Sequence, residues 1–111
     1  MANYNFQEIY KCRNCPNEFK YQVVNKYWIC PVCQTPISVK VKINNYINEC
    51  QYLKPKELKI GYLINLGNNN THSILNIKYE GNCYVISLSD YGNIKREEED
   101  FLLVIMGSWN D

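Results

Sequence analysis

The chain has 111 residues, of which 46% are hydrophobic, and a formal charge of +1 at neutral pH. This length predicts one ordinary domain or two very small ones, and this composition excludes extensive disorder. The near-zero net charge excludes a uniformly basic nucleic-acid binder. No stretch reaches the ~18 uninterrupted apolar residues of a membrane span, and residues 1–11 lack the apolar core of a signal peptide. We therefore expect neither a membrane protein nor an exported one.

Four residue types dominate the composition. Asn, Ile, Lys and Tyr together make up 48 of the 111 residues, and all four have A/T-rich codons. Such a bias fits an A/T-rich microbe or a large DNA virus without any selection on function. We therefore give the Asn68-Asn69-Asn70 run and the number of tyrosines no functional weight.

Six cysteines lie in two distinct patterns, four in close pairs and two alone. Cys12 and Cys15 form one CxxC pair, Cys30 and Cys33 form another, and fourteen residues separate the pairs. Two thiolates three positions apart on a tight turn can both reach one ion, and two such turns complete a tetrahedral sulfur site. The spacing therefore predicts a metal ion bound by these four cysteines in a reducing, intracellular compartment, cytoplasmic or nuclear.

The segments YKCRNCPNEF and WICPVCQTPI resemble the two knuckles of a zinc ribbon, with Phe19 and Trp28 as the expected packing residues. Gln34 departs from the pattern, since many ribbons carry Gly after the last Cys. The resemblance implies one structural Zn²⁺, because four thiolates leave no position for a catalytic water. An iron site of the rubredoxin kind uses the same ligands and stays an alternative, because sequence separates iron from zinc poorly.

The second half of the chain alternates apolar and polar residues between turn signals, which predicts short antiparallel strands. We expect five strands, at 58–66, 73–79, 83–89, 94–96 and 101–106. Five short strands in about fifty residues favour a small barrel, because closure removes exposed edges. The predicted fold is all-β, with a ribbon at 1–40, a linker at 41–56, a barrel at 57–107 and a tail at 108–111.

The segment YVISLSDYGN resembles the third strand and following turn of a Tudor domain, a five-stranded SH3-like barrel. Such domains read methylated Arg or Lys with a cage of aromatic rings. The resemblance implies partner-binding roles for Asp90, Tyr91 and Asn93. Leu88 stands where the family often has a ring, and residues 63–70 supply none. Tyr62 or His72 would have to complete the cage.

The remaining reactive residue types do not form a catalytic group. Cys83 lies in an expected strand, where a buried apolar role is favoured, and Cys50 lies in the expected linker without an adjacent base. His72 is the single histidine, and the acidic run 97–100 is typical of a solvated turn. Without a nucleophile–base pair, a phosphate loop or an open metal site, we expect no enzyme and no small-molecule substrate.

Charge divides the chain into a basic and an acidic half. Residues 1–60 carry nine Lys/Arg and four Glu, whereas residues 61–111 carry three Lys/Arg and seven Asp/Glu. The acidic barrel favours an adaptor that docks a Lys/Arg-rich protein segment such as a histone tail. The alternative is a nucleic-acid-binding transcription accessory protein, or a viral or phage factor acting on host machinery. Its expected phosphate contacts near the knuckles are Lys11, Arg13, Lys20 and Lys26.

Overall fold

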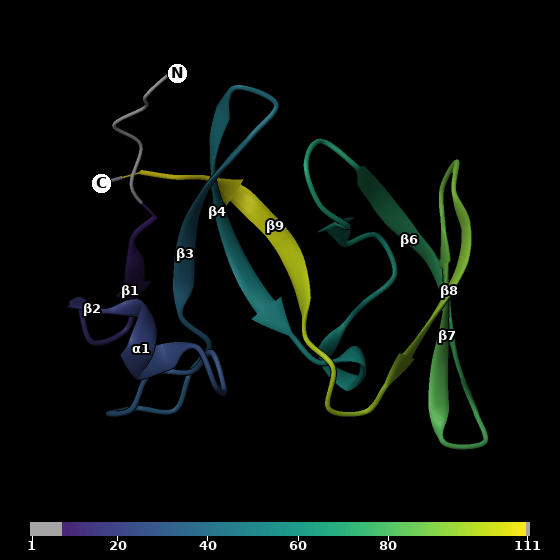
Figure 1. The fold of residues 1–111 in the computed structure, drawn as a ribbon, viewed down its shortest axis with the longest axis horizontal. Helices are drawn as coiled ribbons and strands as arrows, with labels where there is room; N and C mark the ends of the chain where they lie inside the picture. Colours follow the sequence, from purple (N-terminus) through teal and green to yellow (C-terminus); the bar gives the residue numbers. More distant parts are fainter. Residues whose placement is uncertain (1–7, 111) are drawn as a thin grey trace.

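The computed structural model describes residues 8–110, and these form one antiparallel sheet of nine strands in the order β2-β1-β3-β4-β9-β5-β6-β7-β8 (Figure 1). The strands are β1 (Tyr10–Cys12), β2 (Asn17–Phe19), β3 (Ser38–Ile43), β4 (Tyr46–Leu53), β5 (Leu63–Asn65), β6 (Thr71–Glu80), β7 (Cys83–Leu88), β8 (Gly92–Glu97) and β9 (Leu102–Ser108). A short helix, α1 (Tyr21–Val24), and a 3-10 helix, η1 (Pro55–Glu57), complete the elements. The all-β class is confirmed.

The expected ribbon begins and the expected tail ends outside this part of the chain, since residues 1–7 and 111 are not among those described. Within residues 8–110, neither helix has the length or the apolar character needed to cross a membrane.

The segment 41–56, expected to be a linker, instead contains the end of β3, all of β4 and the first two residues of η1. β3 and β4 form a hairpin whose register runs from Val39↔Cys50 to Ile43↔Tyr46. Its two-residue turn has φ of 56° at Asn44 and 67° at Asn45. Such a turn needs positive φ at both positions, and Asn tolerates this conformation better than most residues. The asparagines therefore fix a hairpin where a linker was expected.

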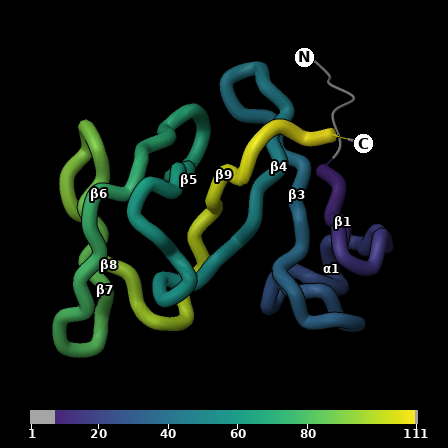
Figure 2. The backbone as a smooth tube through the Cα atoms, turned by 180° about the vertical axis from the view of Figure 1, so that it is seen from behind, coloured from purple at the N-terminus to yellow at the C-terminus, as the bar shows by residue number. Residues whose placement is uncertain are grey.

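β4 also pairs with the last strand, β9, from Asn48↔Ser108 to Leu53↔Leu102, with a bulge after Glu49. Figure 2 shows β9 in yellow running beside β4 and separating it from β5. The knuckle-bearing half of the chain is thus joined to the second half by a ladder of backbone hydrogen bonds.

The five strands expected in the second half are present as β5 to β9. The first is shorter than expected, because residues 60–61 form a turn in which Gly61 has a φ of 96°. The last strand pairs with the first, β9 with β5, and the others follow in chain order. In the described residues β8 is an edge strand, so the hydrogen-bonded ladder is open rather than closed as a barrel requires.

Two hydrophobic cores lie on opposite faces of the sheet. We name them after the expectations for the two halves of the chain. What we call the barrel core consists of Leu53, Leu58, Ile64, Ile74, Ile86, Leu88, Ile94, Leu102 and Val104. What we call the ribbon core consists of Tyr10, Cys12, Val24, Cys30, Ile37 and Val39, with Trp28 and Tyr52 packed against it. Successive residues of a strand point to opposite faces, so β4 contributes Leu53 to one core and Tyr52 to the other. β4 therefore packs against both cores, one on each of its faces.

Candidate metal centre

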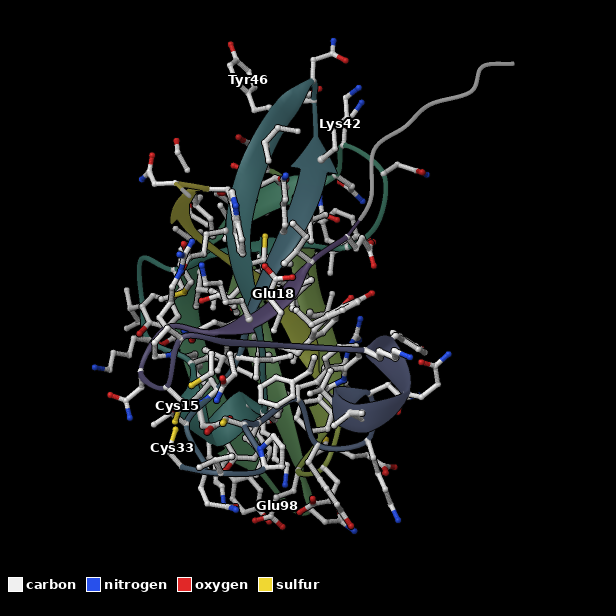
Figure 3. All side chains as sticks on the ribbon, turned by 90° about the vertical axis from the view of Figure 1, so that its left-hand side faces the viewer. Cys15, Glu18, Cys33, Lys42, Tyr46 and Glu98 are labelled. Carbon is white, nitrogen blue, oxygen red and sulfur yellow. The ribbon has the colours of Figure 1, made fainter. Side chains whose placement is uncertain are left out.

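The four paired cysteines converge on one point at the end of the sheet. Their sulfur atoms all lie within 4.8 Å of one another, and the Sγ atoms of Cys12 and Cys33 are 3.5 Å apart. Figure 3 shows the labelled Cys15 and Cys33 close together at this edge. Metal–sulfur bonds of about 2.3 Å in a tetrahedron place the sulfurs about 3.8 Å apart. The group therefore fits one tetrahedral ion, and the predicted clustering of the four cysteines is confirmed.

Local backbone geometry builds each half of the cluster. β1 ends at Cys12, and the N–H of Cys15 donates to the Cys12 sulfur at 3.2 Å. In the second half the N–H of Val32 donates to the Cys30 sulfur at 3.3 Å. Such N–H···S bonds offset negative charge on a thiolate, so both turns are prepared for ionised cysteines.

Side chains add to this stabilisation. Hydrogen bonds from Asn14 and Thr35 lower the pKa of Cys33 to about 5. The hydrogen bond to Cys33, together with burial, raises the pKa of Cys15 to about 12. Four thiols this close cannot all ionise without a compensating cation. A divalent metal ion supplies that compensation when it binds.

The site is closed by its own ligands. Cys12 and Cys30 are fully buried in the ribbon core, and Cys15 and Cys33 are half-buried. Because four thiolates fill all the positions of a tetrahedral ion, the arrangement suits a structural metal rather than a catalytic one.

Gln34 stands where many zinc ribbons have Gly, and the turn nevertheless keeps its conformation. Gln34 has a φ of 68°, in the left-handed region that Gly adopts most easily. Its N–H donates to the Cys30 carbonyl at 2.9 Å, and the Cys30 N–H donates to the Thr35 carbonyl at 2.8 Å. Two hydrogen bonds thus hold a side-chain-bearing residue in the conformation that the turn requires.

Arg13, expected as a phosphate contact, is engaged within the protein. Its guanidinium donates to both carboxylate oxygens of Glu49, at 2.8 and 3.3 Å, and lies 4.4 Å from the centre of the Trp109 ring. The Ser38 hydroxyl donates to the same carboxylate at 2.6 Å. Burial favours neutral Glu49, but Arg13 and Ser38 outweigh it and lower the pKa of Glu49. We call Arg13, Ser38, Glu49 and Trp109 the knuckle clamp.

The knuckle clamp was not predicted from the sequence. Arg13 and Glu49 are 36 positions apart, and Trp109 lies beyond the last strand. No local pattern in a single sequence pairs such distant residues.

The other three basic residues expected near the knuckles are the lysines Lys11, Lys20 and Lys26. Lys11 is half-buried on β1, and Lys20 is exposed immediately before α1. The ammonium group of Lys26 lies 5.4 Å from the centre of the Tyr27 ring.

The expected partner-binding residues surround the turn between β7 and β8. Asp90 has a φ of 56°, and Tyr91 is 52% exposed with its ring centre 4.8 Å from that of His72. A ring nitrogen of His72 lies 2.7 Å from the Ser89 carbonyl oxygen, which fixes the imidazole against this turn. Asn93 is exposed on β8 opposite Ser87.

Leu88 and Tyr62, the two other positions considered for the aromatic cage, do not join the His72–Tyr91 pair at the surface. Leu88 is 3% exposed within the barrel core, and Tyr62 is half-buried against the same core. The surface at the turn therefore offers one phenol ring and one imidazole.

No protein-family model matches the sequence, and neither the search of curated proteins nor the search of solved structures found a match.

Proposed function

We propose that this protein is a non-enzymatic adaptor of a reducing intracellular compartment, in which a zinc ribbon stabilises one half and a Tudor-like barrel docks a basic protein segment. The convergence of four cysteine sulfurs within 4.8 Å is the observation that carries the first part. The acidic second half of the chain, with its exposed Tyr91, supports the second.

Zinc is the ion that best suits the cluster. A closed four-cysteine site on two tight turns is typical of structural Zn²⁺. The ribbon core is small, and binding of a structural zinc contributes an apparent ~10–16 kcal/mol to the folding of such segments.

Metal analysis of the purified chain tests this assignment. We expect one zinc ion per chain, loss of that ion in Cys30→Ser, and full zinc content in Cys83→Ser, which changes a cysteine outside the cluster. Iron bound with the visible absorption of a ferric thiolate site would reject zinc in favour of the rubredoxin alternative. A Cys30→Ser chain with undiminished metal would reject the ligand set.

The packing of the second half supports a barrel-like curvature. Strands β5 to β9 each contribute to a single core: Ile64, Ile74, Ile86, Ile94 and Val104 are one residue from each. A flat sheet cannot bring its outermost strands to one core, so the sheet must curl. Pairing of the last of these strands with the first fits an SH3-like or Tudor-like arrangement.

The turn at the end of β7 is the proposed docking site. Asp90 supplies a carboxylate, Tyr91 and His72 supply two ring faces, and Asn93 supplies a polar side chain beside them. One exposed ring contributes only about 0.5–1 kcal/mol of cation–π attraction. Affinity for a basic peptide would then arise mainly from charge, and methylation of the peptide would change it little.

Titration of the isotope-labelled full chain with a Lys/Arg-rich peptide tests the docking site by nuclear magnetic resonance. We expect chemical-shift changes at Tyr91 and Asn93, weaker binding above about 0.15 M salt, and a loss in Tyr91→Ala. Tyr79→Ala is the matched control, because Tyr79 is similarly exposed (57%) but lies at the other end of the β6–β7 hairpin. Equal binding by both variants, or nucleic acid shifting Tyr91 and Asn93 instead, would favour the transcription-accessory alternative.

A further inference from the structure

A second surface feature lies where the ribbon half meets the barrel half. A cavity of about 230 Å³ opens between the loop before the second knuckle, the end of β4, η1 and the start of β9. Its lining includes Tyr27, Tyr52, Phe101, Lys54, Lys56 and Glu57. We call this the junction groove.

The walls of the junction groove are aromatic and partly rigid. Tyr52 stacks on Trp28 with ring centres 4.1 Å apart and an angle of 27° between the rings. Tyr27 stands at the rim with 56% of its surface exposed, and Phe101 is half-buried. Pockets for whole drug-sized ligands are typically about 300–1,000 Å³, so this smaller cavity suits a single flat ring.

Lysines outnumber carboxylates by one among the residues that line or contact the groove, with Lys26, Lys54 and Lys56 against Glu57 and Glu99. Glu99 accepts from the Lys54 ammonium group at 2.7 Å, and Glu57 accepts from the Lys54 backbone N–H at 2.8 Å. Lys56 lines the cavity, and the ammonium group of Lys26 lies over Tyr27 at the rim. Aromatic faces beside lysines are the combination that binds single-stranded nucleic acid.

We propose that the junction groove binds single-stranded nucleic acid, with one base against Tyr27, Tyr52 and Phe101 and the neighbouring phosphates on Lys26 and Lys56. This activity is separate from the proposed docking of a basic segment at Tyr91. A strand suits the groove better than a free nucleotide does. The phosphate contacts come from flexible lysines, which bind weakly one at a time and add up only along a strand.

Fluorescence anisotropy on the full metal-loaded chain, with a labelled oligothymidylate of about 12 nucleotides, tests the proposal. We expect binding that is tighter than binding of a duplex of equal length. Tyr27→Ala should weaken it about 5- to 150-fold, the range for loss of one stacked base, while Tyr27→Phe should retain it. Lys56→Ala should reduce the slope of log affinity against log salt concentration by about 1, the value for one lost phosphate contact.

Tyr46→Ala is the matched control. Tyr46 is 73% exposed at the tip of the β3–β4 hairpin, at the opposite end of β4 from the groove (Figure 3). Metal content of each variant shows whether the ribbon has remained folded. Equal effects of Tyr27→Ala and Tyr46→Ala, or no preference for the single strand over the duplex, would overturn the proposal. A mononucleotide that binds as tightly as the oligonucleotide, or an acidic peptide that binds the groove in its place, would overturn it as well.

Discussion

Two cysteines outside the metal cluster differ sharply in their surroundings. Cys50 is fully buried in β4, and burial, followed by the charge of Glu49, raises its pKa to about 12. Cys83 is partly exposed at the start of β7. Because the thiolate is the reactive form, the two thiols should differ in reactivity although neither binds the proposed metal.

Alkylation of the metal-bound protein with iodoacetamide at pH 8 should modify Cys83 and leave Cys50 intact. At that pH a thiol with a pKa of about 12 is only about 0.01% ionised. Mass spectrometry of proteolytic fragments gives the two rates, and a denatured sample shows that Cys50 can react once exposed. Modification of Cys50 in the folded protein as fast as Cys83 would contradict its burial.

The raised pKa of Cys50 makes the free energy of unfolding depend on pH. A thiol whose pKa is raised in the folded state favours folding below its unfolded pKa of about 9, and this contribution is lost as the pH rises toward 12. Comparison of urea unfolding at pH 7.5 and about pH 10.5 should show a smaller loss of stability in Cys50→Ala than in the wild type. Equal losses of stability in the wild type and in Cys50→Ala would show that ionisation of Cys50 does not destabilise the protein at alkaline pH.

At the scale of elements, the knuckle clamp connects the first CxxC turn to β4 and to the chain beyond β9. Arg13 lies between Cys12 and Cys15, and besides Glu49 it donates to the Asn110 carbonyl at 2.9 Å. The Trp109 N–H donates to the Ile47 carbonyl at 3.1 Å, which holds the ring in place. The clamp therefore fastens the first CxxC turn to β4 and to the segment that follows β9.

A double-mutant cycle of Arg13→Ala and Glu49→Gln should measure a coupling of about 1 kcal/mol in urea unfolding of the metal-bound protein, because the pair is bidentate and partly buried. The lowered pKa of Glu49 means that this contribution is present above pH 4.5 and is lost as the pH falls below that value. The Lys54–Glu99 pair is the control, since Glu99 is 77% exposed. Equal coupling in the two pairs, or none in the first, would contradict the clamp.

The sequence predicted those elements whose determinants are local. Two CxxC pairs specify their own turns, so the clustering of the four cysteines could be predicted without knowledge of the fold. Alternation and turn residues likewise located the strands β6 to β9. The β3–β4 hairpin lies in the segment 41–56, which was expected to be a linker, although Asn44 and Asn45 between alternating apolar residues also signal a hairpin.

Contacts between distant segments account for what the sequence did not predict. Three features bring the first half of the chain into contact with its C-terminal end: the pairing of β4 with β9, the knuckle clamp and the junction groove. The alternation in β4 identifies two apolar faces but does not say which partner covers each. Whether the ladder of strands closes into a barrel or stays open depends on where the strands end. Strand ends are the feature that local sequence patterns define least well.

At the scale of the whole molecule, one sheet carries two cores that depend on different sources of stability. The ribbon core includes two of the four clustered cysteines, Cys12 and Cys30, whereas the barrel core consists of aliphatic residues of β5 to β9 and their neighbours. β4 lies between them and pairs with β3 on one side and β9 on the other. Removal of metal should therefore weaken the sheet in a graded manner across β4.

Hydrogen exchange of the backbone amides before and after addition of a strong chelator tests this account most directly. We expect amides of β1, β2 and β3 to lose protection, those of β4 to lose part of it, and those of β6 and β7 to keep it, because the barrel core has its own apolar contacts. Simultaneous loss of protection in β1 and β7 would contradict two separate cores. Full protection of β3 without metal would contradict a metal-stabilised ribbon.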